Sequence, residues 1–380
     1  MVSIRKVFLL QGILPNYRVR FITDLASDPR LNLGVLYSHP SQSESKDGFR
    51  NGSLSTEISQ YEIPSPQDKP FSFLLHLLEL IWQERPEIVI TGYWHISIYL
   101  LVLFKKFFGF RLVLWHGGFP FKNGEALSTH VERIKKSRFP NFLHHCDSLI
   151  VYSEHAARTF ENYFDVESTK INVAPNAPDT DLFFKLKASE EVGNAALRSR
   201  FSPNGEKILV TIGRLTKARK LDLLLDVISL MKSEGRRISL VVIGSGPEGQ
   251  KLVSEVRKRG LQNVYFEGEI FDDHQIGCYL AASDIYVYTG VASLAVKIAM
   301  SMGLPTVGFD YGLEVHNIED GVTGYVIPFG DTRAMAIKLG YLVDHDDVRS
   351  AMGKEGHSLM VTKINTETMV SGFLESIFPN

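Results

Sequence analysis

The chain is poor in cysteine and has almost no net charge. Its 380 residues include only 2 cysteines, Cys146 and Cys278, which lie far apart and show no CxxC spacing. This excludes a disulfide scaffold, and two cysteines alone cannot form a structural zinc site. We therefore expect a reducing, cytoplasmic location. The 41 Lys and Arg residues against 43 Asp and Glu argue against nucleic acid as a partner.

Long hydrophobic runs are also missing. The longest, Ile96 to Phe104, is ended by Lys105 and Lys106. A bilayer-spanning helix needs about 20 apolar residues, so none is expected. The stretch LFKKFFGFRL around these lysines has two interpretations. It is either a core helix end followed by a buried strand, or an interfacial patch in peripheral contact with the inner face of the cytoplasmic membrane.

What the chain does contain is an alternation of short apolar runs with helical patterns. Runs such as KILVTIGR and SLVVIGSG are almost entirely apolar and β-branched, which is typical of parallel strands covered on both faces. The predicted strands are Val7–Leu10, Ile88–Thr91, Leu112–Trp115, Ser148–Tyr152, Asn172–Ala174, Ile208–Ile212, Ser239–Ile243, Val264–Glu267, Ile285–Tyr288, Thr306–Phe309 and Tyr325–Ile327. The pattern predicts the α/β fold class.

A break in this alternation predicts two domains. Residues 176–202 are rich in Pro, Asn, Asp and Ser without a clear period, which indicates an interdomain connection. We predict two doubly wound, Rossmann-like domains, 1–185 and 186–360, that face each other across a cleft. A C-terminal helix at 360–380 can pack back on the first domain. The default ligand site is at the carboxyl ends of the strands.

A cluster of cations follows one of the predicted strands. Arg214 lies directly at the strand end, and Lys217, Arg219 and Lys220 follow before the helical segment LDLLLDV. Arginine and lysine at such a place suit a diphosphate. The alternative is a solvated basic loop. The glycine turn at 244–247 is a weaker nucleotide signal, because many α/β proteins turn this way.

The motifs of the second half resemble a known enzyme family. GRLTKARKLDLLL, VVIGSGPEGQKL, AASDIYVY, AMSMGLPTV and EDGVTGYVI are similar to the donor domain of GT-B glycosyltransferases of family 4, the glycosyl transferases of group 1. LVLWHGG and SLIVYSEHAARTF match more loosely in the first half. The resemblance implies a GT-B fold and the transfer of a sugar, with retention, from a UDP- or GDP-sugar to a saccharide or lipid-linked saccharide in polysaccharide or glycoconjugate biosynthesis. It implies no metal and no other cofactor.

The resemblance also implies site residues. It gives Arg214, with Arg219 or Lys220, contact with the donor diphosphate. The remaining matches are Gly290, Ser293 and Leu294 beside the phosphates, Gly244, Ser245, Gly246, Glu267, Gly268 and Ile270 near the nucleoside, and Glu314 at the donor sugar.

One departure from the family pattern concerns its usual Glu-x7-Glu pair. Gly290 and Ile298 stand at these positions, and the pattern resembles a branch without the pair. Its loss favours one alternative, a non-catalytic subunit that partners an active glycosyltransferase. A sugar-nucleotide epimerase is a separate alternative. The acidic and histidine residues of an epimerase cleft are not found.

Two histidines are candidate catalytic residues. His116 ends the strand segment RLVLWHGG, where an imidazole can orient the acceptor hydroxyl or help to deprotonate it. His95, at the end of EIVITGYWH, is the second candidate. The triplet Asp179-Thr180-Asp181 is interpreted as the start of a helix rather than a metal-binding DxD motif.

Overall fold

The structure is a computed structural model that describes residues 4–38, 52–92, 96–119, 131–132, 134–136, 139–189 and 195–379. Their contacts divide into two compact units. The first unit takes its residues from Met1–Phe119, Ser128–Asp179 and Thr366–Asn380, and the second is Thr180–Asn365. In the described part of the chain, no helix is both long and apolar enough to cross a membrane.

The first unit is built on a parallel sheet of seven strands in the order β3-β2-β1-β4-β5-β6-β7. The strands are β1 (Arg5–Leu10), β2 (Leu31–Tyr37), β3 (Ser59–Glu62), β4 (Ile88–Thr91), β5 (Arg111–His116), β6 (Ser148–Val151) and β7 (Ile171–Val173). The helices are α1 (Asn16–Ala26), α3 (Pro70–Glu84), α4 (Ile96–Phe108), α6 (Phe139–His145), α7 (Glu154–Phe164) and the C-terminal α16 (Thr366–Ile377).

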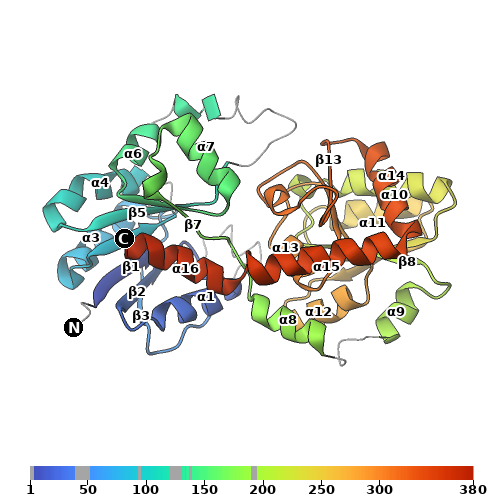
Figure 1. Cartoon of the computed structure of the whole chain (residues 1–380), viewed down its shortest axis with the longest axis horizontal. Helices are drawn as coiled ribbons and strands as arrows, with labels where there is room; N and C mark the ends of the chain where they lie inside the picture. The colour runs from blue at the N-terminus through green and yellow to red at the C-terminus, as the bar shows by residue number, and fades with distance from the viewer. Residues whose placement is uncertain are drawn as a thin grey trace. The chain divides into compact units, whose positions relative to one another are not determined.

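Alternating side chains of the first sheet fill the core. Val7, Leu9 and Trp115 belong to a buried cluster that includes residues of α1 and α16. The two helices lie side by side, although the ends of the chain carry them (Figure 1). The C-terminal helix also packs on β6 and β7. The first unit is therefore completed by the last residues of the chain.

The second unit has a parallel sheet of six strands in the order β10-β9-β8-β11-β12-β13. The strands are β8 (Lys207–Ile212), β9 (Ile238–Ile243), β10 (Val264–Gly268), β11 (Ile285–Tyr288), β12 (Thr306–Phe309) and β13 (Gly324–Ile327). The helices are α8 (Thr180–Ala188), α9 (Ala195–Phe201), α10 (Leu221–Ser233), α11 (Gly249–Lys258), α12 (Asp273–Ala281), α13 (Ala295–Ser301), α14 (Thr332–Asp344) and α15 (Asp346–Thr362).

This second sheet has the strand order of a doubly wound nucleotide-binding fold. The order reverses between β8 and β11, which pair directly in register. In such sheets, ligands bind at the carboxyl ends of the strands on either side of the reversal. A ligand site is therefore expected at the chain segments after Ile212 and after Tyr288.

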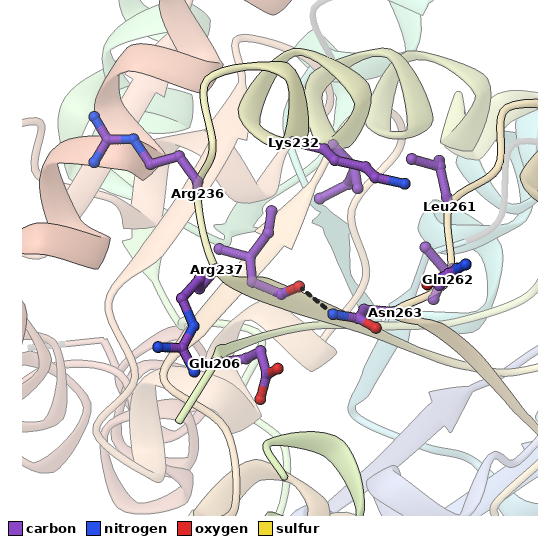
Figure 2. A pocket seen from close by; sticks show the side chains of 10 residues that line it. Glu206, Lys232, Arg236, Arg237, Leu261, Gln262 and Asn263 are labelled. Atoms are coloured by element: carbon purple, nitrogen blue, oxygen red, sulfur yellow. Dashed lines mark hydrogen bonds between the residues drawn. The ribbon is translucent and has the colours of Figure 1, made fainter. Parts of the chain in front are cut away.

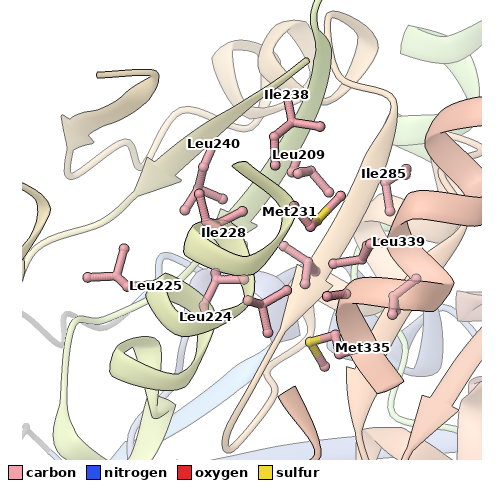
Figure 3. Packing of buried hydrophobic residues seen from close by; sticks show 14 of the residues in the cluster. Leu209, Leu224, Leu225, Ile228, Met231, Ile238, Leu240, Ile285, Met335 and Leu339 are labelled. Carbon is pink, nitrogen blue, oxygen red and sulfur yellow. The ribbon is translucent and has the colours of Figure 1, made fainter. Parts of the chain in front are cut away.

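The two faces of the second sheet are covered by different helices. Leu209 packs with side chains of α10 and α14 on one face (Figure 3). Its neighbours Ile208 and Val210 belong to a second cluster, which includes residues of α8, α12 and α13. The near-continuous apolar run of β8 is explained by this burial on both faces.

An aspartate in each unit joins two neighbouring strands at their amino ends. Asp284 accepts the backbone N–H of Ile208 at 2.8 Å and two bonds from Arg198 at 3.1 Å. Asp147 likewise accepts the backbone N–H of Leu112 at 2.7 Å and bonds from Lys105 at 2.8 Å. The same device therefore holds the start of β8 beside β11 and the start of β5 beside β6.

The structure confirms the α/β fold class and every predicted strand, with shifts of a residue or two at the ends. Strands β2 and β3 were not predicted. The interpretation of 176–202 as an irregular connection was wrong in part, because α8 and α9 lie within it. α8 buries Phe183 and Leu186 against the second sheet's core, and this burial stabilises a helix whose local pattern is weak.

Replacing Asp284 by alanine tests the strand-joining role. We expect a loss of about 2–4 kcal/mol in the free energy of unfolding of the second unit, because a buried N–H and a guanidinium lose their acceptor. Denaturant titration followed by circular dichroism measures it. Asp346→Ala is the control, since this carboxylate pairs with Lys207 and Arg349 at the surface and should matter little. Equal losses in the two variants would contradict the assignment.

Candidate functional site

Three loops are joined by backbone hydrogen bonds at the carboxyl edge of the second sheet. The N–H of Gly213 donates to Ile243 O at 2.9 Å, and the N–H of Leu215 donates to Ser245 O at 2.7 Å. The N–H of Gly244 donates to Gly268 O at 2.6 Å. The segments that follow β8, β9 and β10 therefore form one continuous surface of backbone and short side chains.

Glycine at position 244 is required by this packing. Its φ of +134° lies in the region that disfavours other residues, and a Cβ atom there would overlap the carbonyl oxygen of Gly213. The nucleoside loop that the sequence predicted from Gly244, Ser245 and Gly246 is thus held directly against the end of β8. The Ser245 hydroxyl bonds to the carboxylate of Glu269.

The loop after β11 is locked to the basic segment that follows β8. The buried hydroxyl of Thr289 shares its one proton between the carbonyl oxygens of Arg219 at 3.1 Å and Lys220 at 2.8 Å. The N–H of Val291 donates to Ala218 O at 2.9 Å. A Cβ atom on Gly290 would overlap the backbone of Ala218 and Arg219. With the loop in this position no side chain fits at 290, and this accounts physically for the missing glutamate.

Arg219 differs from the neighbouring cations of this edge because its guanidinium is packed against the protein backbone. Its guanidinium folds back against Gly213, where it occupies the space of a missing side chain. Burial lowers the pKa of Arg219, and Tyr286 opposes that shift. The guanidinium makes no hydrogen bond or ion pair with any described residue. Because arginine stays charged at neutral pH, the charge is left for an external anion.

The other predicted cations surround this position. Arg214 follows Gly213 directly and is half-buried. Lys220 adopts a left-handed conformation with φ +51° and precedes the first residue of α10. Lys217 is exposed in a short 3-10 turn with Arg219. The structure therefore brings Arg214, Arg219 and Lys220 to the strand-order reversal.

The residues predicted near the nucleoside differ in what they can do. The Glu267 carboxylate accepts two bonds from Arg200 at 2.8 Å and one from the Tyr279 hydroxyl at 2.7 Å. Gly268 ends β10 with φ +74°, and Ile270 packs against the core. The side chain of Glu267 is thus engaged within the protein, whereas the neighbouring Phe271 is 75% exposed, a feature the sequence analysis missed.

The remaining residues predicted to contact the sugar donor lie around α13 or have side chains outside the described residues. Ser293 and Leu294 directly precede this helix, and the hydroxyl of Ser293 accepts a long bond of 3.4 Å from the N–H of Ala295. Ile298 is partly buried against the same core cluster as α13. Glu314 begins a 3-10 turn, but its side chain lies outside the described residues, as does all of His95.

His116 ends β5 in the first unit and is enclosed by aromatic rings. The ring centroids of Phe119 and Phe160 lie 5.2 and 5.5 Å from that of the imidazole. Burial lowers the pKa of His116 to about 3. The imidazole is therefore neutral at physiological pH.

The tautomer of His116 follows from its hydrogen bond. The backbone N–H of Gly118 donates to Nδ1 at 3.0 Å, so Nδ1 carries a lone pair and Nε2 carries the proton. Such an imidazole donates a hydrogen bond from Nε2 but has no second lone pair to accept a proton.

A pocket opens at the opposite edge of the second sheet (Figure 2). It lies at the start of β9 and β10 and is lined by residues that include Glu206, Arg237 and Asn263. Two of its cations are engaged within the protein: Lys232 donates to Gly260 O at 2.5 Å, and Arg236 pairs with Asp344. The pocket contains none of the predicted site residues.

Comparison with known families matches both halves of the chain. Residues 206–345 match the family profile of the glycosyl transferases group 1, and residues 36–182 match Glycosyltransferase Family 4. Both profiles describe glycosyltransferases, and together they identify the chain as a glycosyltransferase of group 1, family 4. The resemblance noted in the sequence is thereby confirmed, together with its GT-B fold of two Rossmann-like units.

Individual relatives are distant. An alpha-D-kanosaminyltransferase of Streptomyces kanamyceticus is 27% identical over 184 residues, 46% of each chain. A poly(ribitol-phosphate) alpha-N-acetylglucosaminyltransferase of Staphylococcus aureus is 25% identical over 44% of this chain and 35% of that protein. The chain spans about half the length of the curated relatives it matches.

Solved structures match over almost the whole chain. The sucrose-phosphate synthase of Thermosynechococcus elongatus has a TM-score of 0.76 at 15% identity, with 98% of both chains covered. Anabaena HepE in complex with UDP has a TM-score of 0.72 at 15% identity, covering 98% of this chain and 99% of that one. At this identity the likeness shows the glycosyltransferase fold alone.

The environment of His116 generates a prediction about pH. Nitrogen NMR of the imidazole should show a neutral ring with the proton on Nε2 from pH 8 down to pH 5. Because the folded pKa of about 3 is below the ordinary 6.5, His116 contributes stability that is present above pH 6.5 and is lost as the pH falls toward 3. The signal is assigned to His116 by its absence from the spectrum of the His116→Asn variant. A titration midpoint near 6.5 would contradict the buried environment.

Proposed function

We propose that the protein is a retaining glycosyltransferase. It moves a hexose from a nucleotide-diphosphate sugar to a saccharide or lipid-linked saccharide. The observation that carries this proposal is the Arg219 guanidinium, which has no acceptor among the described residues and lies beside Arg214 at the strand-order reversal. The glycosyltransferase family and the names of its polysaccharide-forming members support it.

The chemistry of the transfer follows from the charges. Negative charge grows on the departing diphosphate as the glycosidic bond breaks, and fixed guanidinium groups stabilise that charge without reorganisation. Arg219 and Arg214 supply what a metal ion supplies in other enzymes, so we propose a metal-independent reaction. In this proposal the proton of the acceptor hydroxyl passes to the departing phosphate oxygen, and His116, whose Nδ1 accepts from the N–H of Gly118, is assigned no proton transfer.

The nucleotide is proposed to be UDP or GDP. A solved relative of this fold, Anabaena HepE, is described in complex with UDP and with UDP-glucose. This makes UDP the first nucleotide to test.

A second candidate function is a non-catalytic subunit that binds a partner glycosyltransferase. Gly290 and the core-packed Ile298 favour it, since neither can replace the glutamate pair of the family pattern. A subunit of this kind has no need for the Arg219 guanidinium, which has no acceptor among the described residues. Absence of binding to both nucleotides would favour this alternative.

Substitution in the basic loop tests the diphosphate site. We expect Arg219→Ala and Arg214→Ala each to weaken UDP or GDP binding by about 1.5–3 kcal/mol, roughly ten- to a hundredfold, because a charge-assisted hydrogen bond is lost. Calorimetric titration of the full chain measures the affinity. Lys217→Ala is the matched control, since this lysine is exposed in the same turn. Equal and negligible effects for all three would remove the diphosphate from this loop.

We also propose that the first unit contacts an anionic membrane surface. Five large apolar side chains of α3 and α4 are exposed: Phe71 72%, Leu75 51%, Trp82 53%, Leu103 68% and Phe107 72%. We call them the α3–α4 apolar face. Arg85 lies 3.9 Å from the centre of the Trp82 ring, and Lys106 is exposed on α4. Aromatic rings beside cations suit an interface with anionic phospholipid.

One lysine expected in this patch is not available to a membrane. Lys105 donates to His145 O at 2.6 Å and to both carboxylate oxygens of Asp147 at 2.8 Å. Its charge is therefore used inside the first unit. The proposed contact depends on the apolar side chains with Arg85 and Lys106.

Vesicle sedimentation tests the membrane proposal. Vesicles containing phosphatidylglycerol should bind the protein, and vesicles of phosphatidylcholine alone should bind it more weakly. The double variant Trp82→Ser with Phe107→Ser should lower binding at least tenfold, because it removes two exposed rings. Ile337→Ser on α14, another exposed apolar position, should leave it unchanged. Unaltered binding of the double variant would contradict the proposal.

A further inference from the structure

The first unit contains a buried arginine without a carboxylate partner. Arg18, in the first turn of α1, is only 4% exposed. Its guanidinium donates to the Tyr152 hydroxyl at 3.1 Å and makes a long contact of 3.8 Å with the sulfur of Met369. No described residue forms an ion pair with it. A guanidinium has five N–H donors, so most of its donor capacity is left over.

A second unsatisfied donor belongs to the ring that this guanidinium covers. The Cζ atom of Arg18 lies 4.2 Å from the centre of the Trp115 ring. Trp115 is 5% exposed, and its Nε1 has no hydrogen-bond partner in the part of the chain that the structure describes. The cation–π contact stabilises the charge but accepts none of the N–H bonds. The cluster is therefore rich in donors and poor in acceptors.

Packing does not explain why an arginine occupies this position. The ring centroids of Phe21 and Phe373 lie 6.1 and 4.9 Å from that of Trp115, so the surroundings are largely apolar. An uncompensated buried charge destabilises a protein, and an apolar side chain here would avoid that cost. Buried donors without acceptors in a native fold call for an occupant that supplies them.

The position in the fold is that of a ligand site. Trp115 is the penultimate residue of β5, Tyr152 follows β6, and Arg18 lies in the helix after β1. All three are at the carboxyl edge of the first sheet, where parallel α/β sheets bind ligands. Tyr152 is partly exposed and Tyr17, whose ring centre is 5.2 Å from the Arg18 Cζ, is 40% exposed. These two tyrosines contact Arg18 and are themselves partly exposed.

We propose that Arg18 and Trp115, with Tyr152, form an anion subsite that binds the acidic group of the acceptor, a carboxylate or a phosphate. A guanidinium fork matches the two oxygens of either group, and the indole N–H adds a third donor. The assignment of the acid to an acceptor rests on the proposed glycosyltransferase function. The acid arrives on an acidic sugar in one case and on a phosphorylated acceptor in the other.

Titration of the full chain with small probes tests the subsite and its two sources. Glucuronate is compared with glucose, and glycerol 1-phosphate with glycerol, by calorimetry and tryptophan fluorescence. We expect saturable binding of at least one acidic probe and at least tenfold weaker binding of its neutral counterpart. Trp115→Phe should remove the fluorescence change, which assigns it among the 3 tryptophans. The preferred acidic probe identifies the source of the acid.

Variants of Arg18 separate the subsite from the rest of the protein. Arg18→Met should lower the affinity for the acidic probe at least tenfold, and Arg18→Lys should lower it less, because the charge remains without the fork. Arg20→Met is the matched control, since Arg20 lies on the same helix, is 45% exposed and pairs with Asp24. If Arg18→Met does not fold, two measurements still test the subsite. One compares acidic and neutral probes on the wild-type chain, and the other measures the affinity of the Arg18→Lys variant for the acidic probe.

Two results overturn the proposal. One is equal affinity for acidic and neutral probes in the wild-type chain. The other is unchanged affinity for the acidic probe in a folded Arg18 variant. A parallel titration with UDP and GDP reports on the second unit. If a nucleotide binds while acidic probes do not, the subsite fails and the proposed function stands; if neither nucleotide binds, the proposed function fails independently.

Discussion

The carboxyl edge of the second sheet depends on the contacts that hold the basic turn at 217–220 against the loop after β11. Thr289 binds two carbonyl oxygens of the turn, and glycine at 290 allows the backbone of Ala218 to approach. This contact fixes the direction of the Arg219 side chain, which then lies over Gly213. The position at the strand-order reversal of a positive charge that pairs with no described residue is thus a consequence of backbone packing. The absence of a side chain at 290 is part of the same arrangement.

The two units use one architecture with different polar residues at the carboxyl edge. Each has a parallel sheet with a strand-order reversal, and each joins two strands through an aspartate at the opposite end. The second unit presents Arg219 and Arg214 at that edge. The first presents a neutral His116 on one side of β5 and the Arg18–Trp115 stack on the other, because adjacent residues of a strand point to opposite faces. A cationic edge and a donor-rich edge both favour anionic ligands.

Sequence patterns predicted the central strands and the position of the basic turn after β8, but edge elements and tertiary partners were beyond them. β3 (SQYE) is largely exposed, so it carries no apolar run, and β2 contains Asn32 and Gly34, which weaken its pattern. The burial of Arg18 arises from α16, whose Met369 is 351 residues away in the chain. Likewise, only the folded chain places the Arg219 guanidinium against Gly213. The tautomer of His116 also depends on folding, because it is set by the N–H of Gly118.

The most direct test of the proposed diphosphate site is a crystal structure of the full chain grown with UDP and, separately, with GDP. The account predicts a nucleotide whose diphosphate oxygens lie about 2.7–3.2 Å from the guanidinium nitrogens of Arg219, with the phosphates at the loops after β8 and β11. A nucleotide bound in the pocket beside Glu206 and Arg237, or one that leaves Arg219 without a contact, would contradict it.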